Sequence, residues 1–212
     1  MSKFFSLYGK LLVTAIIQHL SYVLISVSIG CIIALILGVF LSRFRKLSAV
    51  IMPLLSVFQT IPGIVFIGIL FLYIGMRPLT IIIALSVYAI FPVLKNTYTG
   101  LVEVPLHYIE AARGCGMTSL QSLFKVEIPL ALPSIFAGVR MSVIYITSWA
   151  VLASMIGQGG LGDFVYTGVA TNNSTLIIAG AIPSALMAVS LAKLIDYVKG
   201  RVIPKGMRGD SI

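Results

Sequence analysis

Long stretches without a charged residue alternate along the sequence with short clusters of lysine and arginine. Residues 11–42, 47–76 and 164–192 contain no Asp, Glu, Lys or Arg. About 20 consecutive apolar residues are enough for a helix to cross the hydrocarbon core of a bilayer. Strands of a membrane barrel would instead alternate apolar and polar residues over about 10 positions, and these stretches do not alternate. The pattern therefore predicts an all-α membrane protein.

The uncharged stretches predict about five membrane-spanning helices within a single transmembrane domain covering residues 1–212. The first apolar stretch is too long for one upright span. We therefore interpret residues 1–19 as an interfacial helix that leads into the membrane. A cleaved signal peptide is the alternative, but no small-residue cleavage site of the A-x-A type closes this run. The expected spans are 22–41, 53–75, 79–94, 134–156 and 175–194.

The composition does not fit a protein whose surface faces water. Hydrophobic residues make up 59% of the 212 residues and charged residues only 10%, whereas about a quarter of the residues of a soluble domain are charged. An ordinary soluble enzyme, a disordered scaffold and a small secreted protein are therefore excluded. The two cysteines, Cys31 and Cys115, do not suggest a disulfide framework.

The positive charges indicate how the chain is oriented. The net charge is +9, and most of the 15 lysine and arginine residues fall in segments 43–46, 95–125 and 193–212. A topology of five spans puts these three segments on the same side of the membrane. Because lysine and arginine collect in cytoplasmic loops, we expect a multi-pass protein of the bacterial cell membrane with its N-terminus outside and its C-terminus in the cytoplasm. This placement explains the net charge without a nucleic-acid partner.

Acidic residues are scarce, and none of the six falls within an expected span. Carriers and pumps driven by protons or ions typically bury a carboxylate within the membrane as a relay. The phosphate-binding pattern G-x-x-x-x-G-K-[ST] is missing as well. A transport function would therefore need energy from another polypeptide. His107 has no second His or Cys at ligand spacing, so we expect no metal site.

Arg140 lies within the fourth expected span, about one and a half turns from its start. A cation at that depth costs roughly 3 kcal/mol on insertion scales unless it is paired or hydrated. We interpret its side chain as reaching back to the cytoplasmic interface, with a direct contact to substrate as the alternative. The sequence also leaves open a passive channel and a membrane-embedded enzyme, although it offers no paired acids for the latter.

Residues 97–133 are the one long polar segment, and its first half predicts a short helix. Pro105 suits the first turn of a helix, where its missing N–H has no cost. Gly114 and Gly116 can end the helix in a left-handed turn. Such an amphipathic element either lies on the membrane surface as a solvated hairpin or docks into a groove on a cytosolic partner.

The second half of this segment predicts another short helix. Thr118, followed three residues later by Gln121, forms a capping-box pattern at its start. Pro129 and Pro133 are expected to break the helix before the next span begins.

A family motif lies within this polar segment. It resembles the EAA loop of ABC importer permeases, in which a Glu-Ala-Ala triplet is followed by a glycine four positions on and by an apolar-x-apolar-Pro ending. Segments 59–62 (Gln-Thr-Ile-Pro) and 157–162 (Gly-Gln-Gly-Gly-Leu-Gly) look like those of the osmoprotectant branch, which imports glycine betaine, carnitine or choline. The second segment is also similar to one in methionine importers, so a methionine or other amino-acid permease is the alternative. The motif residues are Glu110, Ala111, Ala112, Gly116, Val126, Ile128 and Pro129.

The resemblance implies a type I importer permease with the MetI-like fold, without catalytic residues or cofactors of its own. It implies ABC ATPase subunits that bind ATP and Mg²⁺, a second permease that is either another copy or a related chain, and an extracytoplasmic substrate-binding protein. Closure of the ATPases would bring two coupling helices together and favour the outward-facing state. By this resemblance, the residues that contact the ATPase are Glu110, Ala111, Ala112, Arg113 and Gly116.

Polar and aromatic residues within the spans are candidates for a translocation pathway. A proline in the second span frees backbone groups, and irregular backbone at membrane depth normally faces protein or a water-filled cavity. Aromatic faces attract quaternary ammonium groups through cation–π interactions, although packing or lipid contact is the alternative for these rings. The candidates are Gln59, Thr60, Pro62, Tyr88, Tyr145 and Trp149.

The glycine-rich segment after the fourth span is expected to form a turn or a re-entrant loop at the outer face. Glycine lets the backbone approach a neighbour closely, so this segment could gate the pathway. A phosphate-binding loop is excluded because no strand precedes it and it has no lysine. The glycines are Gly157, Gly159, Gly160 and Gly162.

Overall fold

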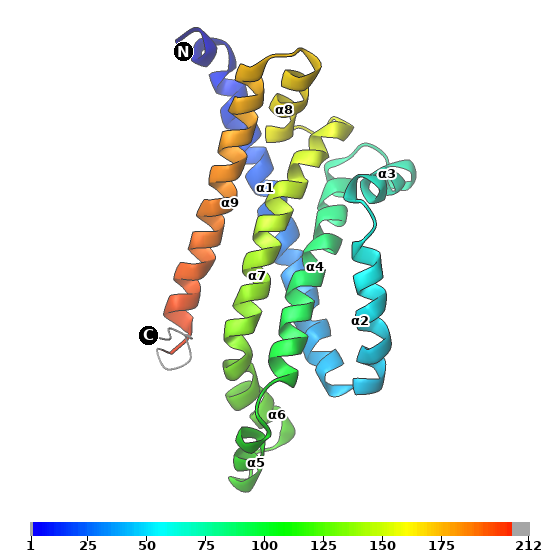
Figure 1. The fold of residues 1–212 in the computed structure, drawn as a ribbon, viewed down its shortest axis with the longest axis vertical. Coiled ribbons are helices and arrows are strands. Elements are labelled where there is room, and N and C mark those ends of the chain that lie inside the picture. Colours follow the sequence, from blue (N-terminus) through cyan, green and yellow to red (C-terminus); the bar gives the residue numbers. More distant parts are fainter. Residues whose placement is uncertain (1, 205–212) are drawn as a thin grey trace.

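The computed structural model describes residues 2–204 and, within that range, the side chains from residue 7 onward except those of residues 153, 155 and 156. The described chain contains no strand, which confirms the predicted all-α class. Its long helices run between two ends of an elongated bundle, with α5 (Leu106–Gly114) at one end and α8 (Leu161–Ala170) at the other (Figure 1). We refer to these as the α5 end and the α8 end. The basic tail from residue 205 onward lies outside the described residues and includes Lys205, Arg208 and Asp210.

The described helices supply about as many membrane spans as the sequence predicts. Four helical stretches are long and apolar enough to cross a membrane, and the bent pair α2–α3 makes a fifth. A π-helix, η1, precedes α7, and a 3-10 helix, η2, follows it. Besides α5 and α8, the elements are α1 (Ser2–Arg43), α2 (Arg45–Gln59), α3 (Gly63–Ile74), α4 (Pro78–Val102), α6 (Ser119–Ser122), η1 (Leu123–Glu127), α7 (Ile128–Ala150), η2 (Val151–Ile156) and α9 (Ser174–Val202).

Helix α1 is longer than a single membrane crossing. Its 42 residues extend over about 63 Å at 1.5 Å per residue, roughly twice the thickness of the hydrocarbon core. No proline interrupts it, and no break separates residues 2–19 from the first expected span. The segment expected as an interfacial helix is therefore the first half of α1 and not a separate helix.

The second expected span is not a single helix. α2 ends at Gln59, α3 begins at Gly63, and the two helices are bent by 91° relative to each other. Pro62 has an extended backbone (φ −58°, ψ 127°), which lies outside the helical region. The expected span 53–75 is therefore a bent pair of helices, and the break falls next to Thr60.

Helices α1, α4 and α7 form the centre of the bundle, and α9 packs against α7 and α8 (Figure 1). Small residues bring the central helices close together, as is common in membranes. A Cβ on Gly30 of α1 would lie only 2.5 Å from the Cβ of Ala89 on α4, and a Cβ on Gly138 of α7 would lie 2.8 Å from the carbonyl oxygen of Pro92. The fully buried side chains of this core include Val23, Ile81 and Ile146.

Arg140 forms an ion pair on the surface of the bundle. Helix α9 continues to Val202, beyond the expected end of the fifth span, and so carries Asp196 alongside α7. Arg140 Nε donates to Asp196 Oδ2 at 3.0 Å, and both side chains are nearly half exposed. Asp196, which lies beyond the expected fifth span, thus belongs to the last helix. The ion pair accounts for Arg140 without a contact to substrate.

Candidate functional site

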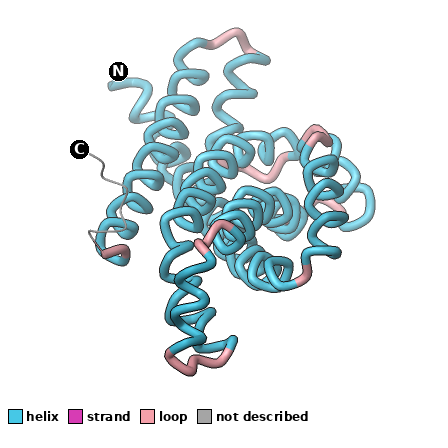
Figure 2. The backbone as a smooth tube through the Cα atoms, turned by 60° about the horizontal axis from the view of Figure 1, so that its bottom comes forward, coloured by secondary structure: helices cyan, strands magenta, loops and turns pink. Residues whose placement is uncertain are grey.

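The first candidate site is the hairpin of α5 and α6, which projects beyond the long helices (Figure 1 and Figure 2). Large apolar side chains are exposed on it and just after it: Leu106 is 63% exposed, Leu120 68% and Phe124 65%. An exposed apolar patch on a projecting element is typical of an interaction surface. Of the residues expected to contact the ATPase, Ala112 is buried, and the exposed ones are Glu110, Ala111, Arg113 and Gly116.

Gly116 shapes the connection between α5 and α6. Its φ of +77° lies in the left-handed region, where other residues are strained. The backbone N–H of Gly116 donates to Arg113 O at 2.9 Å, and that of Met117 donates to Ala112 O at 3.1 Å. The predicted left-handed end of the helix is therefore confirmed at Gly116, whereas Gly114 is the last helical residue.

The capping box predicted at the start of α6 is present. The backbone N–H of Thr118 donates to Gln121 Oε1 at 2.9 Å, and the backbone N–H of Gln121 donates to Thr118 Oγ1 at 3.3 Å. Two N–H groups that the helix itself cannot pair are thereby satisfied. The box fixes the direction in which the chain leaves the turn at Gly116.

Thr118→Ala is expected to loosen the hairpin without unfolding the bundle. Loss of a helix cap costs about 1 kcal/mol, and here the cost falls on a helix of only four residues. We expect a several-fold faster protease cleavage of the hairpin, measured by limited proteolysis in detergent. Ser119→Ala, one position along and outside the cap, serves as the control. Equal cleavage rates for the two variants would contradict this role for the box.

The hairpin continues into α7 through the π-helical turn η1. α7 begins at Ile128, with Pro129 in its first turn and Pro133 inside the helix. The prediction that these two prolines break the helix before the span is therefore wrong. One helical stretch runs from Ser119 to Ala150, and Pro129 is accommodated directly after the π-helical turn η1. Pro133, one turn further on, stands in α7 without ending it.

An ion pair with a buried carboxylate joins this turn to the end of α1. Arg43 Nη2 donates to Glu127 Oε2 at 2.6 Å, and Ser122 Oγ donates to Glu127 Oε1 at 3.1 Å. The Glu127 side chain is only 5% exposed. The sequence does not reveal this pair, because its partners are 84 residues apart. The only local signal is a carboxylate placed directly before an apolar span.

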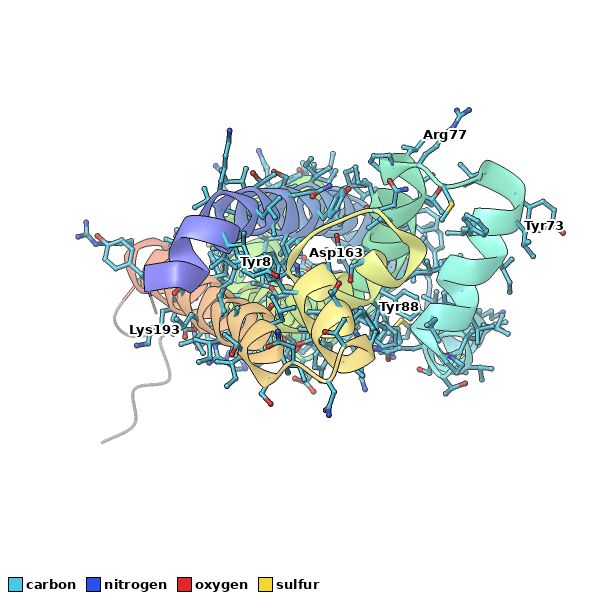
Figure 3. All side chains as sticks on the ribbon, turned by 90° about the horizontal axis from the view of Figure 1, so that it is seen from above. Tyr8, Tyr73, Arg77, Tyr88, Asp163 and Lys193 are labelled. Atoms are coloured by element: carbon cyan, nitrogen blue, oxygen red, sulfur yellow. The ribbon has the colours of Figure 1, made fainter. Side chains whose placement is uncertain are left out.

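The second candidate site is a cavity of about 310 Å³ at the break between α2 and α3. Five of the six predicted pathway residues line it, and the sixth, Pro62, lies at the break. In the view from the α8 end, Tyr88 lies between α8 and α3, whereas Tyr73 and Arg77 point outward (Figure 3). The lining residues are Ser56, Gln59, Thr60, Tyr88, Tyr145, Ile146 and Trp149.

Aromatic rings form the wall of this cavity. Tyr88 stacks on Trp149 with ring centres 5.0 Å apart and planes 14° apart. The Tyr88 hydroxyl also donates to Ile61 O at 2.8 Å, which pairs a carbonyl group next to the helix break. Tyr88 therefore stabilises the irregular backbone, while Tyr145, which is 43% exposed, offers its ring to the open side.

Gly63 makes room for this wall. A Cβ on Gly63 would lie 1.7 Å from the ring atom Cζ3 of Trp149. No side chain larger than hydrogen fits between the start of α3 and the ring. The position of Trp149 beside Tyr88 thus depends on the Pro62–Gly63 step.

The third candidate site is the glycine-rich turn between η2 and α8. Gly157, Gly159 and Gly160 have φ values of +72°, +73° and +94°, which favour glycine. Gly162 lies within α8 and is constrained by contact instead, because a Cβ there would lie 2.1 Å from the carbonyl oxygen of Val151. The segment forms a turn that leads into α8.

Polar residues of α1 hold this turn in place. Gln18 Nε2 and the Tyr22 hydroxyl both donate to the carbonyl oxygen of Gln158, at 2.8 Å and 3.0 Å. His19 between them is fully buried, and its Nε2 lies 3.1 Å from Thr147 O. The sequence does not mark these residues as functional, because polar positions on an apolar helix do not reveal their partners.

A family model described as "Binding-protein-dependent transport system inner membrane component" matches residues 26–206. The matched range includes the α5–α6 hairpin, the cavity and the glycine-rich turn. The chain belongs to this family. The permease is accordingly a multi-pass membrane protein that works with a substrate-binding protein and an ATPase, and it is not itself an enzyme.

Several similar proteins cover almost the whole permease. It is 38% identical over 192 residues to the glycine betaine/carnitine/choline transport system permease protein OpuCB of Bacillus subtilis, covering 91% of this chain and 88% of the relative. It is 38% identical over 205 residues to the carnitine transport permease protein OpuCB of Listeria monocytogenes, covering 97% and 94%. It is 36% identical over 196 residues to the osmoprotectant import permease protein OsmW of Salmonella typhimurium, covering 90% and 91%.

A solved structure of the MetNI methionine ABC transporter, in an inward-facing conformation, has the same fold. The TM-score is 0.75 at 25% sequence identity, and the match covers 92% of the permease and 95% of the other chain. This similarity confirms the predicted MetI-like fold of type I importers.

Proposed function

We propose that the permease imports quaternary-ammonium osmoprotectants of the glycine betaine, carnitine and choline class, using ATP that separate ATPase subunits hydrolyse. The observation that carries this proposal is the 36–38% identity, over most of the chain, to permeases named for these substrates or for osmoprotectants. The methionine transporter shares the fold at 25% identity. The sequence similarity therefore favours osmoprotectants over methionine, which was the alternative.

The cavity at the α2–α3 break is the proposed substrate pathway. Its lining combines the hydroxyl and amide groups of Ser56, Gln59 and Thr60 with the rings of Tyr145 and Trp149, and includes no carboxylate. Cation–π contacts attract a quaternary ammonium group without the strong hold of a buried negative charge. Because a transported molecule must leave as readily as it enters, such a weak site suits passage.

Tyr145→Ala is expected to lower uptake several-fold. The variant removes the ring that faces the open side of the cavity, and a cation–π contact contributes about 1 kcal/mol. Tyr145→Phe keeps the ring and should retain most of the activity. Radiolabelled choline uptake into cells that contain the complete transporter measures both variants. Tyr73→Ala, on the outward-pointing side of α3, is the matched control, and equal uptake by the two alanine variants would contradict the assignment.

The hairpin of α5 and α6 is the proposed contact with the ATPase. Glu110 and Arg113 are exposed on α5 and can form charge-assisted hydrogen bonds with the partner, while the small side chain of Ala111 permits close approach. The positive-inside bias puts the α5 end in the cytoplasm. The N-terminus, at the opposite end (Figure 1), then lies outside, and the C-terminal end of α9 lies in the cytoplasm.

The complete importer contains two permeases and two ATPases that bind ATP and Mg²⁺. The second permease is another copy of this chain or a related chain, and it closes the open side of the α2–α3 cavity. The binding protein delivers substrate at the α8 end, next to the glycine-rich turn. When the ATPases close, they move the two α5 helices together, and the spans shift to expose the cavity to the outside. No covalent chemistry occurs in the permease.

Reconstitution with the cognate ATPase and binding protein tests this function. Liposomes that contain ATP should accumulate glycine betaine, carnitine or choline and should not accumulate methionine. Accumulation of methionine alone would refute the substrate class. Equal flux without the ATPase would refute the proposal of an ATP-driven importer and indicate a passive channel.

A further inference from the structure

Helix α1 contacts the candidate sites at both ends of the permease. At the α8 end, Gln18 and Tyr22 hold the glycine-rich turn through the carbonyl group of Gln158. At the α5 end, Arg43 holds the root of the α5–α6 hairpin through Glu127. Tyr22 and Arg43 are separated by about 32 Å along the helix axis at 1.5 Å per residue, and Figure 1 shows α1 passing behind the bundle between these ends.

The contact at the α5 end is a short ion pair, and its carboxylate is buried. Both carboxylate oxygens of Glu127 accept a hydrogen bond, one from Arg43 at 2.6 Å and one from Ser122 at 3.1 Å. The Glu127 side chain is 5% exposed. A buried carboxylate that loses its cationic partner is strongly destabilised. Arg43 and Glu127 are therefore expected to remain together when this part of the molecule moves.

Glu127 stands where three elements meet. It is the last residue of η1 and directly precedes α7, while Ser122 is the last residue of α6. One carboxylate thus connects the hairpin, the start of α7 and the end of α1. Single turns of π-helix are rare and occur frequently at functional sites.

Helix α1 is suited to transmit a displacement along its axis. It is continuous from Ser2 to Arg43. It also fits closely against α4, since a Cβ on Gly30 would lie 2.5 Å from Ala89 Cβ and a Cβ on Gly38 would lie 2.7 Å from Thr97 Cγ2. This fit leaves little space in which α1 could bend relative to α4.

The contact at the α8 end falls on a turn in which several glycines have positive φ. The carbonyl oxygen of Gln158 accepts two hydrogen bonds from α1. Its neighbours Gly157 and Gly159 both have positive φ and no side chains. In the described residues, α1 therefore supplies the side-chain hydrogen bonds that hold this part of the turn.

We propose that Arg43 and Glu127 form the positioning contact that passes movement of the α5–α6 hairpin to α1, and that α1 passes it on to the glycine-rich turn at Gln158. This inference rests on the proposed contact between α5 and the ATPase. It assigns the two residues a role in coupling ATP hydrolysis to transport, without contact to substrate or nucleotide.

The test is the number of ATP molecules hydrolysed per substrate molecule imported by the complete transporter in liposomes. In Glu127→Gln and in Arg43→Gln we expect ATP hydrolysis to continue while uptake falls, so that the ratio rises about fivefold, within the range of coupling effects seen for mutations between sites. Because Glu127→Gln removes the buried charge itself and leaves Arg43, which is 41% exposed, this variant should assemble even if Arg43→Gln, which leaves the Glu127 carboxylate unpaired, does not. The exchanged pair Arg43→Glu with Glu127→Arg should lower the ratio again.

Asp196→Asn is the matched control, because it neutralises the acid of the other ion pair among the described residues, which is exposed. Its ratio should equal that of the unmodified transporter. A ratio that stays unchanged in both Glu127→Gln and Arg43→Gln would overturn the proposal. This includes the case in which uptake and ATP hydrolysis fall by the same factor. An equal rise in Asp196→Asn would also overturn the proposal.

A double variant tests the second half of the relay. Tyr22→Phe removes one of the two donors to Gln158 and should also raise the ratio. Combined with Glu127→Gln, it should raise the ratio no further than the larger single effect, because both contacts lie in one path. A ratio equal to the product of the two single effects would show independent contacts and refute the relay.

Glu110→Lys separates this inference from the proposed function. If that variant keeps full uptake, the proposed contact of α5 with the ATPase is refuted. If it abolishes uptake while Glu127→Gln and Arg43→Gln both leave the ratio unchanged, only the relay through α1 is refuted.

Discussion

Gly116→Arg should abolish ATP-dependent uptake while leaving the permease inserted in the membrane. At its φ of +77°, any other residue is strained by about 1–2 kcal/mol, and the long basic side chain would stand on the surface that is proposed to contact the ATPase. The spans are far from this turn, so insertion should be unaffected. Uptake in cells, with the amount of membrane-inserted permease measured by immunoblot, gives the result.

Alanine substitutions at Gly114 and Gly116 distinguish an effect of backbone conformation from an effect of added side-chain volume. Neither Gly114 nor Gly116 has an atom within 4 Å of an added Cβ, but only Gly116 has positive φ. Gly116→Ala should therefore reduce uptake, and Gly114→Ala should not. Glu110→Lys changes only the charge of an exposed side chain, and we expect it to abolish uptake as well. Undiminished uptake in Gly116→Arg or in Glu110→Lys would count heavily against the coupling assignment.

Gly63→Ala should reduce uptake at least about tenfold, because the added methyl group would occupy the place of the Trp149 ring. Overpacking of this kind typically costs 1–3 kcal/mol and is relieved by moving side chains or backbone. Here the ring that must move forms the wall of the proposed pathway. The measurements are choline uptake and the fluorescence of Trp149, the only tryptophan in the chain.

Gly68 on the same helix provides the control for this substitution. An added Cβ on Gly68 has no atom within 4 Å, so Gly68→Ala changes helix propensity in the same direction without touching the cavity. We expect normal uptake and an unchanged tryptophan spectrum. If Gly63→Ala behaves in the same way as Gly68→Ala, the cavity does not depend on the fit that the structure shows.

The features that the sequence predicted correctly depend on neighbouring residues. The capping box needs only Thr118 and Gln121, three positions apart, and the turn after α5 needs only a glycine. The apolar stretches likewise predict how many spans there are, because the length of each is set by the thickness of the bilayer. Such local rules located the α5–α6 hairpin and its turn.

The ends and bends of the helices were harder to predict. An uninterrupted apolar run does not show whether a helix ends near residue 20. In the structure, α1 continues past this position to Arg43. Pro62 indicated irregular backbone in the second span, but the angle of 91° between α2 and α3 also depends on the contacts that Gly63 makes with Trp149. Pro129 and Pro133 do not interrupt the helical stretch from Ser119 to Ala150, because tertiary packing can outweigh the cost of a proline within a helix.

Contacts between distant segments could not be predicted from one sequence. The residues of the α2–α3 cavity were selected by type, yet whether they surround one space depends on how α2, α4 and α7 are rotated against each other. The pairing of Arg43 with Glu127 depends on the long path of the chain between them. The hydrogen bonds from Gln18 and Tyr22 to the carbonyl oxygen of Gln158 could not be predicted either, because they form only after α8 and its turn pack against α1.

Site-directed photo-crosslinking in the assembled transporter tests the central claim most directly. A photoreactive residue at position 110, on the exposed face of α5, should form a covalent adduct with the ATPase subunit. The same residue at position 73, which is 85% exposed and lies on α3 near the opposite end (Figure 1), should form none. An ATPase adduct from position 73, or its absence at position 110 in a transporter that is active, would contradict the account.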